Sequence, residues 1–334
     1  MFIVESYSLA VIFCFITMLC WGSWANTQKL VTGKWRFELF YWDYVIGILL
    51  FSILAAFTLG SQGTQGRAFL DDFHQASSSN IGSAFLGGVI FNLANILLTA
   101  AIAIAGMSVA FPVGIGIALV LGVIVNYLDV KKGDATLLFA GVLLVSVAII
   151  LNARAYKKKS AIAQKPGTKG ILISIIAGVL MSFFYRFIAV AMDVNNFESP
   201  EPQKMTPYTA FVVFAVGILV SNFLFNTIIM KKPIAGGAPI SYDEYFKGKF
   251  SLHLVGILGG AIWGLGNLFS LLAAGKAGPA ISYGLGQGAT VVAAIWGIFI
   301  WKEFEHAPKN VRALLNVMLL LYVAGLLLII FTKM

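Results

Sequence analysis

Charged side chains are scarce in this chain of 334 residues, at 11% of the residues against 59% hydrophobic ones. Together with a mean hydropathy of +0.90, this scarcity excludes a water-soluble protein and indicates an integral membrane protein. A membrane-spanning helix needs roughly 20 apolar residues, so about ten helices would leave little chain beyond connecting loops. The shortage of loop sequence also excludes a separate soluble domain for catalysis.

Cysteine and histidine are scarce as well. The two cysteines, Cys14 and Cys20, lie six positions apart in one apolar run, where a helix would point them to different faces. We therefore expect neither a disulfide nor a metal site. His74, His253 and His306 are scattered over loops and a span end. Because the clustered acids, histidines or cysteines of a membrane enzyme are missing from the predicted spans, we expect no enzyme and no cofactor.

Long apolar runs bounded by charge, glycine or proline predict ten membrane-spanning helices. The predicted spans cover residues 8–27, 40–60, 82–105, 107–128, 135–153, 169–192, 206–229, 251–274, 279–301 and 312–332. A tight turn at Gly106 divides the third span from the fourth, because the apolar stretch there is too long for one span. No lysine or arginine precedes the first run, so we expect that run to be retained rather than cleaved as a signal peptide.

Ten spans place both termini on one side of the membrane. Most lysines and arginines fall in loops on the opposite side, near residues 29–36, 154–169, 231–249 and 302–312. By the positive-inside rule these loops are cytoplasmic, and both termini face the periplasm or the cell exterior. The formal charge of +9 therefore lies in short loops and does not indicate a nucleic-acid partner.

An internal repeat is visible at an offset of 172 residues without gaps, which places Asn95 on Asn267 and Gly106 on Gly278. Five spans separate the copies, and because five is odd the copies have opposite orientations in the membrane. Inverted repeats of this kind build many secondary transporters. Glycine- and alanine-rich helices can also align by composition alone, but the matched asparagine argues against that alternative.

The predicted fold is therefore an all-α integral membrane protein with ten transmembrane helices arranged as two inverted five-helix repeats. The repeats are residues 1–153 and 169–334, and residues 154–168 form a basic cytoplasmic linker. Each chain already contains both halves, so we expect a monomer.

Three stretches carry a resemblance to known transporters. The resemblance to the ureide permeases rests on "IVESYSLAVIFCFITMLCWGSWANTQKL" and on "GVIFNLANILLTAAIAIAGMSVAFPVGIGIALVLGVIVNYLD". The bacterial glucose/ribose-uptake and rhamnose–proton symporter relatives are similar over "GGAIWGLGNLFSLLAAGKAGPAISYGLGQGATVVAAIWGIFIWKEF". All of these belong to the drug/metabolite transporter superfamily. The resemblance implies a ten-helix, proton-coupled carrier of small polar metabolites in a bacterial inner membrane.

Polar side chains inside the predicted spans are the candidate substrate-binding groups, because such groups usually face a cavity or a partner. Arg186, Asn267 and Gln287 lie roughly 9–12 Å below the outer surface at 1.5 Å per residue. Asn92 and Asn95 lie one turn apart near the midplane. The amides suit hydroxyls or ring amides, and Arg186 suits a carboxylate or phosphate. We expect these five groups to converge on one polar cavity.

Aromatic residues complete the predicted pocket. Trp263 is placed to stack on a sugar or a heterocycle, and Tyr185 and Tyr283 are expected to line the same pocket. Trp21 and Trp24, near the cytoplasmic end of their predicted span, indicate an interfacial aromatic belt instead.

Each candidate also has a structural interpretation. Buried amides can bond between helices as packing contacts, and Arg186 can reach the outer interface or pair with Asp193. Asp43, about three residues into the second span, is the best acid for proton coupling, which needs a group whose pKa shifts as the cavity opens and closes. The alternative is that Asp43 only ends a helix at the interface.

These features predict a secondary active transporter that takes up a small polar metabolite with a proton by alternating access. Because Arg186 suits an anionic group and the amides suit hydroxyls, the sequence favours a sugar or sugar acid as the solute. A ureide or nucleobase permease and a metabolite or drug exporter are the alternatives.

Overall fold

The computed structural model describes residues 1–105, 107–159, 168–234, 236–302, 304–305 and 307–333, and the regular structure formed by these residues is helical. The helices are α1 (Tyr7–Ser23), α2 (Ala25–Leu30), α3 (Phe37–Phe57), α4 (Phe69–Gln75), α5 (Ser78–Ala105), α6 (Met107–Asp129), α7 (Ala135–Lys159), α8 (Thr168–Val190), α9 (Pro207–Lys231), α10 (Tyr242–Phe246), α11 (Phe250–Ala277), α12 (Pro279–Gly286), α13 (Ala289–Ile295), the π-helical η1 (Trp296–Ile300) and α14 (Lys309–Phe331). The predicted turn at Gly106 and most of the predicted linker lie outside the described residues.

Nine helical segments of the described chain are long and apolar enough to cross a membrane. They overlap nine of the ten predicted spans. The remaining predicted span, 107–128, corresponds to α6, whose apolar part is the shorter stretch Val113–Asp129. The long apolar helices confirm the prediction of an all-helical, multi-pass membrane protein.

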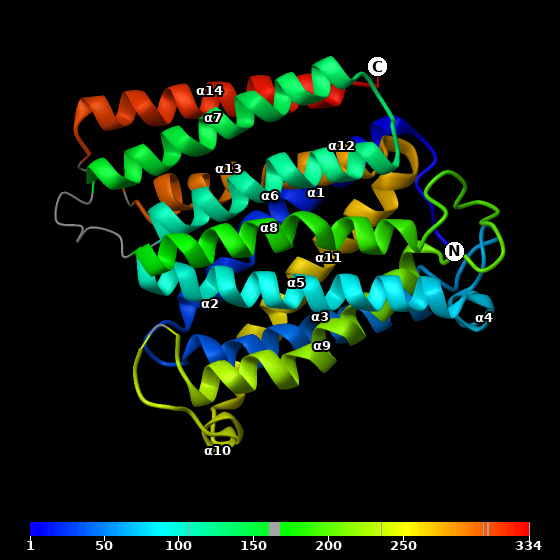
Figure 1. The fold of residues 1–334 in the computed structure, drawn as a ribbon, viewed down its shortest axis with the longest axis horizontal. Helices are drawn as coiled ribbons and strands as arrows, with labels where there is room; N and C mark the ends of the chain where they lie inside the picture. The colour runs from blue at the N-terminus through cyan, green and yellow to red at the C-terminus, as the bar shows by residue number, and fades with distance from the viewer. Residues whose placement is uncertain (106, 160–167, 235, 303, 306, 334) are drawn as a thin grey trace.

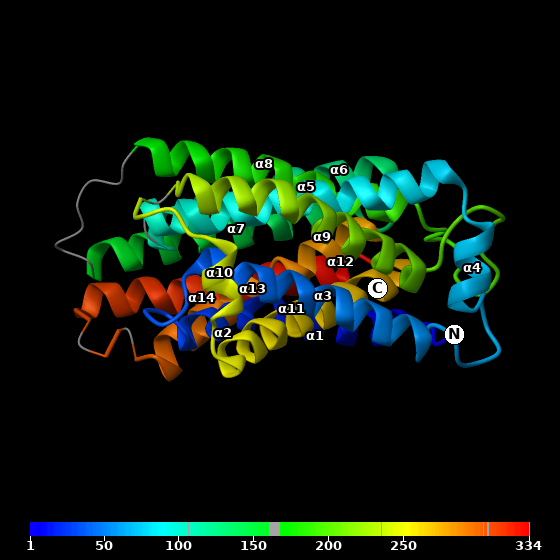
Figure 2. The same ribbon diagram turned by 90° about the horizontal axis from the view of Figure 1, so that it is seen from below.

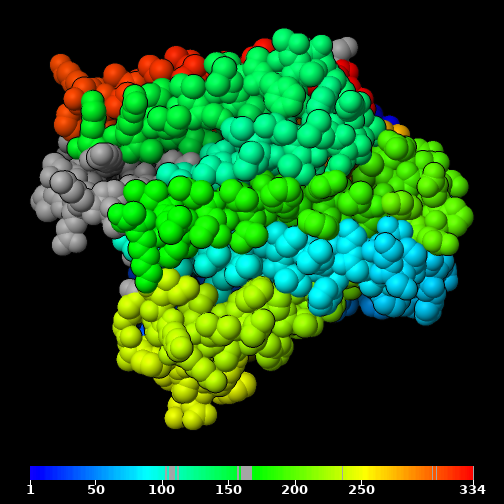
Figure 3. Space-filling view, viewed as in Figure 1, coloured from blue at the N-terminus to red at the C-terminus, as the bar shows by residue number. Residues whose placement is uncertain are grey.

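Both chain termini lie at the same end of the bundle (Figure 1). We call it the terminal end, and it also holds α4 and residues 191–206. The opposite end, the basic end, holds residues 29–36 and 231–249. Figure 3 shows the connection between α9 and α11, in yellow, as a lobe at the basic end.

The helices pack in a pattern that is similar in the two halves of the chain. α5 packs against α8 and α9, and α11 packs against α1 and α3. α7 pairs with α14 along one edge of the bundle (Figures 1 and 2). In this pattern α11 corresponds to α5, α1 corresponds to α8, and α3 corresponds to α9. The central helix of each half therefore has equivalent neighbours.

Glycines bring the backbones of these helices into direct contact in both halves. A Cβ on Gly88 of α5 would collide with the carbonyl oxygen of Phe214 in α9, and a Cβ on Gly260 of α11 would collide with that of Tyr44 in α3. Gly88 and Gly260 are separated by the same 172 residues that relate Asn95 to Asn267. Small residues permit such close approach of membrane helices. The α5–α9 and α3–α11 contacts are therefore built alike.

The predicted span 279–301 is not one continuous α-helix, because it is divided between α12, α13 and η1. At the first division the N–H of Gly288 donates to the carbonyl of Leu285 at 2.9 Å, which is a tighter turn than that of an α-helix. Gly286 and Gly288 flank Gln287, and glycine weakens a helix because it loses more backbone freedom on folding than other residues. The division places Gln287 at a helix break.

Candidate transport site

A cavity of about 70 Å³ lies between α1, α5, α6, α8, α11 and the α12–α13 break. Its aromatic wall consists of Trp21, Trp24, Phe91, Phe184 and Trp263, and its polar groups come from Asn95, Gln287 and Thr290. Trp263 lies near the middle of α11, so the cavity is about halfway along the bundle. One water needs roughly 10–15 Å³, so the cavity has room for several waters or for part of a small solute.

The aromatic wall presents flat, closely stacked rings. Trp21 and Trp263 are nearly parallel, with centroids 5.8 Å apart and an interplanar angle of 8°, and Phe91 lies 4.3 Å from Trp263. The indole Nε1 of Trp21 is buried and has no hydrogen-bond acceptor among the described residues. A planar solute with an acceptor group suits such a wall, because aromatic faces favour offset stacking and a buried N–H favours an acceptor.

The polar groups of the cavity are uncharged. Nδ2 of Asn95 donates to the hydroxyl of Tyr41 at 3.2 Å, and the hydroxyl of Thr290 donates to the carbonyl of Gln287 at 3.2 Å. Among the described lining residues none carries a charged side chain. The cavity can therefore donate hydrogen bonds to an uncharged solute and accept them from it, but it offers no counter-charge to an ion.

The structure brings three of the predicted binding residues, Asn95, Trp263 and Gln287, to the cavity wall. Asn92 lies one turn from Asn95 and donates from Nδ2 to the hydroxyl of Ser221 at 3.0 Å. Asn267 is fully buried, away from the lining, and both of its amide atoms are without a partner in the described part of the chain.

Tyr185 and Tyr283 lie outside the cavity lining and bond to neighbouring helices. The Tyr185 hydroxyl donates to the Ser270 carbonyl at 2.9 Å. The Tyr283 hydroxyl lies 3.2 Å from the Ala118 carbonyl. Both side chains are fully buried, so their hydroxyls are used between helices rather than toward the cavity.

Arg186 does not reach the cavity. Its side chain is 45% exposed, and Nε donates to Oδ2 of Asp129 at 2.5 Å. The partner is thus Asp129 on α6 rather than Asp193, which the sequence suggested. The expected convergence of Arg186 with the four buried amides is not found, because Arg186 lies near the terminal end of α8 and pairs at the surface.

Of the aromatic wall, the sequence predicts only Trp263. Trp21 and Trp24 are predicted at an interface, because the predicted span ends at residue 27. The first span continues through α2 to Leu30, so Trp21 lies deep in the bundle. Phe91 and Phe184 resemble any other apolar core residue in the sequence, and only the fold shows that they face the cavity.

Asp43 occupies a buried polar cluster at the basic end. Its carboxylate accepts from the Tyr245 hydroxyl at 2.6 Å and from Trp35 Nε1 at 3.1 Å, and it lies 2.8 Å from Nδ1 of His253. Asp43 is 1% exposed. Burial, and then the neighbouring carboxylate, raise the pKa of Tyr245 in α10, so its hydroxyl remains a donor to Asp43. The cluster joins α3, α10 and α11.

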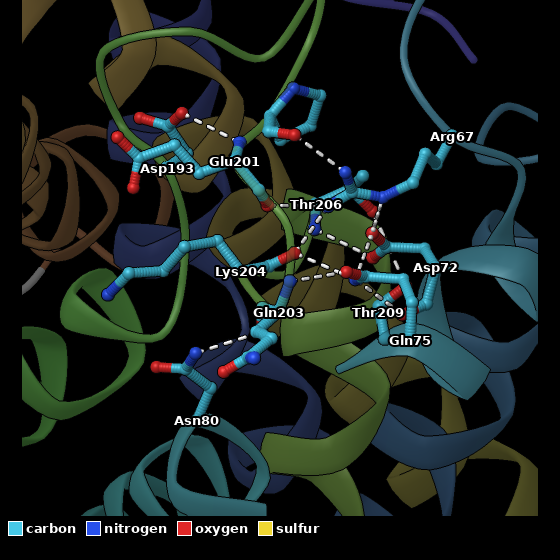
Figure 4. Close-up of polar contacts among 11 residues, drawn as sticks. Arg67, Asp72, Gln75, Asn80, Asp193, Glu201, Gln203, Lys204, Thr206 and Thr209 are labelled. Atoms are coloured by element: carbon cyan, nitrogen blue, oxygen red, sulfur yellow. Dashed lines mark hydrogen bonds and ion pairs between the residues drawn. The ribbon is translucent and has the colours of Figure 1, made fainter. Parts of the chain in front are cut away.

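A second polar cluster lies at the terminal end (Figure 4). The buried carboxylate of Asp72 in α4 accepts from Arg67 Nε at 2.9 Å and from the backbone N–H of Thr206 at 2.7 Å. Arg67 also donates to the carbonyl oxygens of Pro200 at 2.6 Å and Lys204 at 2.5 Å. This cluster ties α4 and residues 191–206 to the first turn of α9.

Comparison with known proteins identifies the family. Residues 40–166 and 157–332 match the sequence model of the ureide permeases. The chain belongs to the ureide permease family. As a ureide permease family member with many apolar helices, it is a multi-pass membrane transporter of small solutes.

Individual relatives agree with this assignment. Ureide permease 4 and ureide permease 2 of Arabidopsis thaliana are 26% and 24% identical, each over 97% of this chain and 97% of the relative. A protein named "Putative sugar uptake protein" from Streptococcus pyogenes is 24% identical over 90% of this chain and 92% of its own length. One solved crystal structure shares the fold with a TM-score of 0.60 at 15% identity, covering 97% of this chain and 96% of the other.

Proposed function

We propose that this permease carries a small, uncharged, planar solute of the ureide or nucleobase type through the central cavity. The observation that carries the proposal is the chemistry of the lining, in which tryptophan and phenylalanine rings surround two amides and a hydroxyl. Nucleobases, hydantoin rings and ureido groups are flat and rich in amide-like donors and acceptors, so aromatic rings and side-chain amides complement them. Membership of the ureide permease family supports the same choice.

A sugar or sugar acid is the second candidate. The sequence favoured it because Arg186 suits an anionic group and the amides suit hydroxyls, but Arg186 pairs with Asp129 at the surface, and the described cavity lining holds no charge for an anion. The name of the streptococcal relative supports a sugar.

A thermal-shift panel on detergent-purified protein distinguishes these solutes. A ligand at 100 times its dissociation constant stabilises the folded state by about 2.7 kcal/mol. We expect a shift with allantoin or uracil and none with glucose, glucuronate or sugar phosphates. A shift confined to sugars or to acidic sugars would contradict the proposal.

The two halves of the chain, residues 1–153 and 169–334, are proposed to form inverted repeats with ten spans in all, as in the drug/metabolite transporter superfamily. Equivalent glycine contacts at Gly88 and Gly260 support this arrangement. Alternating access then consists of exposing the cavity to one end of the bundle and then to the other. A monomer suffices, because one chain holds both halves.

The basic end is proposed to face the cytoplasm of a bacterial cell, with both termini outside the inner membrane. The concentration of lysine and arginine in the loops of the basic end supports this orientation. An epitope added after Lys333 should bind antibody on intact spheroplasts, whereas binding only after lysis would contradict it.

Proton coupling is proposed to use Asp43. The supporting observation is that Asp43 is buried and contacts His253 and Tyr245. A proton bound by this cluster would therefore be held inside the bundle. Among the described residues, the titratable groups in contact with it are Tyr245 from α10 and His253 from α11.

Proteoliposomes test the coupling role of Asp43. In Asp43→Asn we expect accumulation driven by a proton gradient to fall at least tenfold, while solute exchange across the membrane without a gradient continues. Gradient-driven accumulation at the wild-type level would contradict the role, and Glu305→Gln, an exposed acid near the same end, is the control.

A further inference from the structure

A row of buried polar side chains leads from the cavity toward the basic end. Asn95, on the cavity wall, donates to the hydroxyl of Tyr41 in α3 at 3.2 Å. Asn92 of α5 donates to Ser221 of α9 at 3.0 Å, and Asn226 of α9 donates to the Glu38 carbonyl at 2.8 Å. We call Tyr41, Asn92, Ser221, Asn222 and Asn226 the polar seam; all five are buried.

Apart from Asn92, which lies one turn of α5 nearer the terminal end than Asn95, the polar seam lies between the cavity and the basic end. α9 ends at Lys231, and at 1.5 Å per residue Ser221, Asn222 and Asn226 lie about 15, 14 and 8 Å from that end. The Glu38 carbonyl, which Asn226 contacts, is in the first turn of α3. The seam thus extends from mid-membrane depth to the loops of the basic end.

Several amide atoms of the seam are buried without a hydrogen-bond partner among the described residues. They are Oδ1 of Asn92, both amide atoms of Asn222, and Oδ1 of Asn226. Asn222 is fully buried, whereas Val220 and Phe223 beside it are 52% and 60% exposed on the outer face of α9. Because buried amides almost always have partners, these groups indicate contact with water or a polar solute in the seam.

The equivalent positions in the other half carry no side-chain amides. An offset of 170 residues relates α3 to α9, and Gly47 and Gly217 at this offset make equivalent backbone contacts, with Ile257 and Phe85 respectively. The 172-residue offset between α5 and α11 applies to Asn92, and the 170-residue offset applies to the other seam residues. The counterparts of Tyr41, Asn92, Ser221, Asn222 and Asn226 are, in that order, Phe211, Gly264, Phe51, Ser52 and Ala56.

Aromatic rings fill the counterpart of the seam. Phe51 and Phe211 approach to 3.2 and 3.4 Å of the position that a Cβ on Gly264 would occupy. The Ser52 hydroxyl donates a hydrogen bond to the Leu49 carbonyl of the same helix at 2.8 Å. The same helix contacts therefore form without interhelical amides, so the amides of the seam are not needed to hold α3, α5 and α9 together.

We propose that the polar seam is the path by which the solute passes between the central cavity and the basic end. Its side-chain amides exchange hydrogen bonds with the passing solute, which is a small uncharged molecule with donors and acceptors. The counterpart path to the terminal end is closed by Phe51 and Phe211 in the conformation described here. The inference rests on the proposed transport function and assigns the route that this function requires.

Cysteine accessibility tests the route without any solute. The background is Cys14→Ala with Cys20→Ala, which removes both native thiols. A water-soluble sulfonated maleimide is applied to open membrane fragments that carry either Asn222→Cys or the matched control Ser52→Cys, which is the buried counterpart in the other half. Open fragments expose both ends of the bundle, so the result does not depend on membrane orientation.

We expect Asn222→Cys to react at least tenfold faster than Ser52→Cys, because water reaches the seam and not its counterpart. Equal or slower labelling of Asn222→Cys would overturn the proposal. This outcome is independent of substrate identity, so a failure of the ureide assignment leaves the labelling test intact.

A second variant guards against misfolding of the cysteine variant. Asn222→Leu keeps a similar volume and removes both amide atoms, and we expect it to retain the thermal shift given by allantoin or uracil while uptake of that probe falls at least tenfold. Uptake within twofold of the unsubstituted protein would overturn the proposal. If neither probe binds the unsubstituted protein, the ureide assignment fails, and the labelling result alone decides the route.

Discussion

The two ends of the bundle hold buried aspartates in equivalent frameworks but with different partners. Asp72 at the terminal end bonds to the guanidinium of Arg67, and Asp43 at the basic end bonds to the imidazole of His253 and the hydroxyl of Tyr245. The short helices involved, α4 and α10, each precede the central helix of their half. A guanidinium presents a rigid fork of donors and cannot accept a hydrogen bond, whereas an imidazole can donate or accept.

The comparison teaches that the two ends hold their aspartates with different chemistry. At the terminal end a guanidinium and the Thr206 backbone N–H bind Asp72 and tie α4 to α9. At the basic end an imidazole, an indole and a tyrosine hydroxyl surround Asp43. The proposed proton coupling would use this difference between the two ends.

The largest effects are expected where the two halves share a framework. Gly88→Ala and Gly260→Ala each place a methyl group against a backbone carbonyl of the neighbouring helix, and each should destabilise the fold by about 3 kcal/mol or more. Thermal unfolding of the purified variants measures the loss. Gly82→Ala is the control, since nothing lies within 4 Å of its Cβ position. Losses that differ widely between Gly88 and Gly260 would contradict equivalence of the halves.

The terminal cluster should give the next largest effect. Asp72→Ala leaves the Arg67 guanidinium and the Thr206 N–H without their carboxylate, which should lower the free energy of unfolding by about 2–4 kcal/mol. The matched control is the exposed neighbour in Asp71→Ala, which should change it by less than about 0.5 kcal/mol. Similar Tm values for the two variants would contradict a stabilising role of the Asp72 contacts.

A smaller effect on stability, but a distinct effect on transport, is expected at the basic end. His253→Gln leaves Asp43 with hydrogen bonds from Trp35 and Tyr245, so the Tm should change little. Accumulation by proteoliposomes driven by a proton gradient should fall severalfold, because the imidazole contacts the carboxylate proposed to carry the proton. Arg67→Gln is the comparison at the terminal end, and we expect it to lower Tm while keeping gradient-driven accumulation. The reverse pattern would assign proton coupling to the terminal end and stabilisation to the basic end.

The smallest effect is expected for the exposed ion pair at the terminal end. Arg186→Gln removes a contact with Asp129 in which 45% of the arginine side chain is exposed, and surface pairs contribute about 0–1 kcal/mol. Uptake and Tm should stay near the values of the unsubstituted protein. Loss of solute binding in this variant would show that Arg186 contributes to solute binding.

The pattern of apolar runs predicted the helices well, because the length of a membrane span leaves few alternatives. Nine of the ten predicted spans match long apolar helical segments of the described chain to within a few residues. The division at Gln287 was less predictable, since "YGLGQG" is compatible with both a packed helix and a broken one. A helix break depends on neighbouring helices that the local sequence does not reveal.

The binding site was only partly predictable, for a different physical reason. Asn95, Trp263 and Gln287 stand out in the sequence because polar or large amphipathic groups are unusual at mid-membrane depth. Arg186 stands out equally, and only the fold reveals that Asp129 lies beside it. His253 seemed isolated because its partners, Asp43 and Tyr245, are far apart in sequence.

The pairing of α7 with α14 resembles an interface between two subunits. Gly141 lies against the carbonyl oxygen of Gly325, and Gly325 lies against that of Gly141. Reciprocal contacts of this kind are the mark of an isologous interface between identical subunits. The edge of the bundle therefore has, inside a single polypeptide, the geometry that a dimer of the proposed five-helix repeat would form.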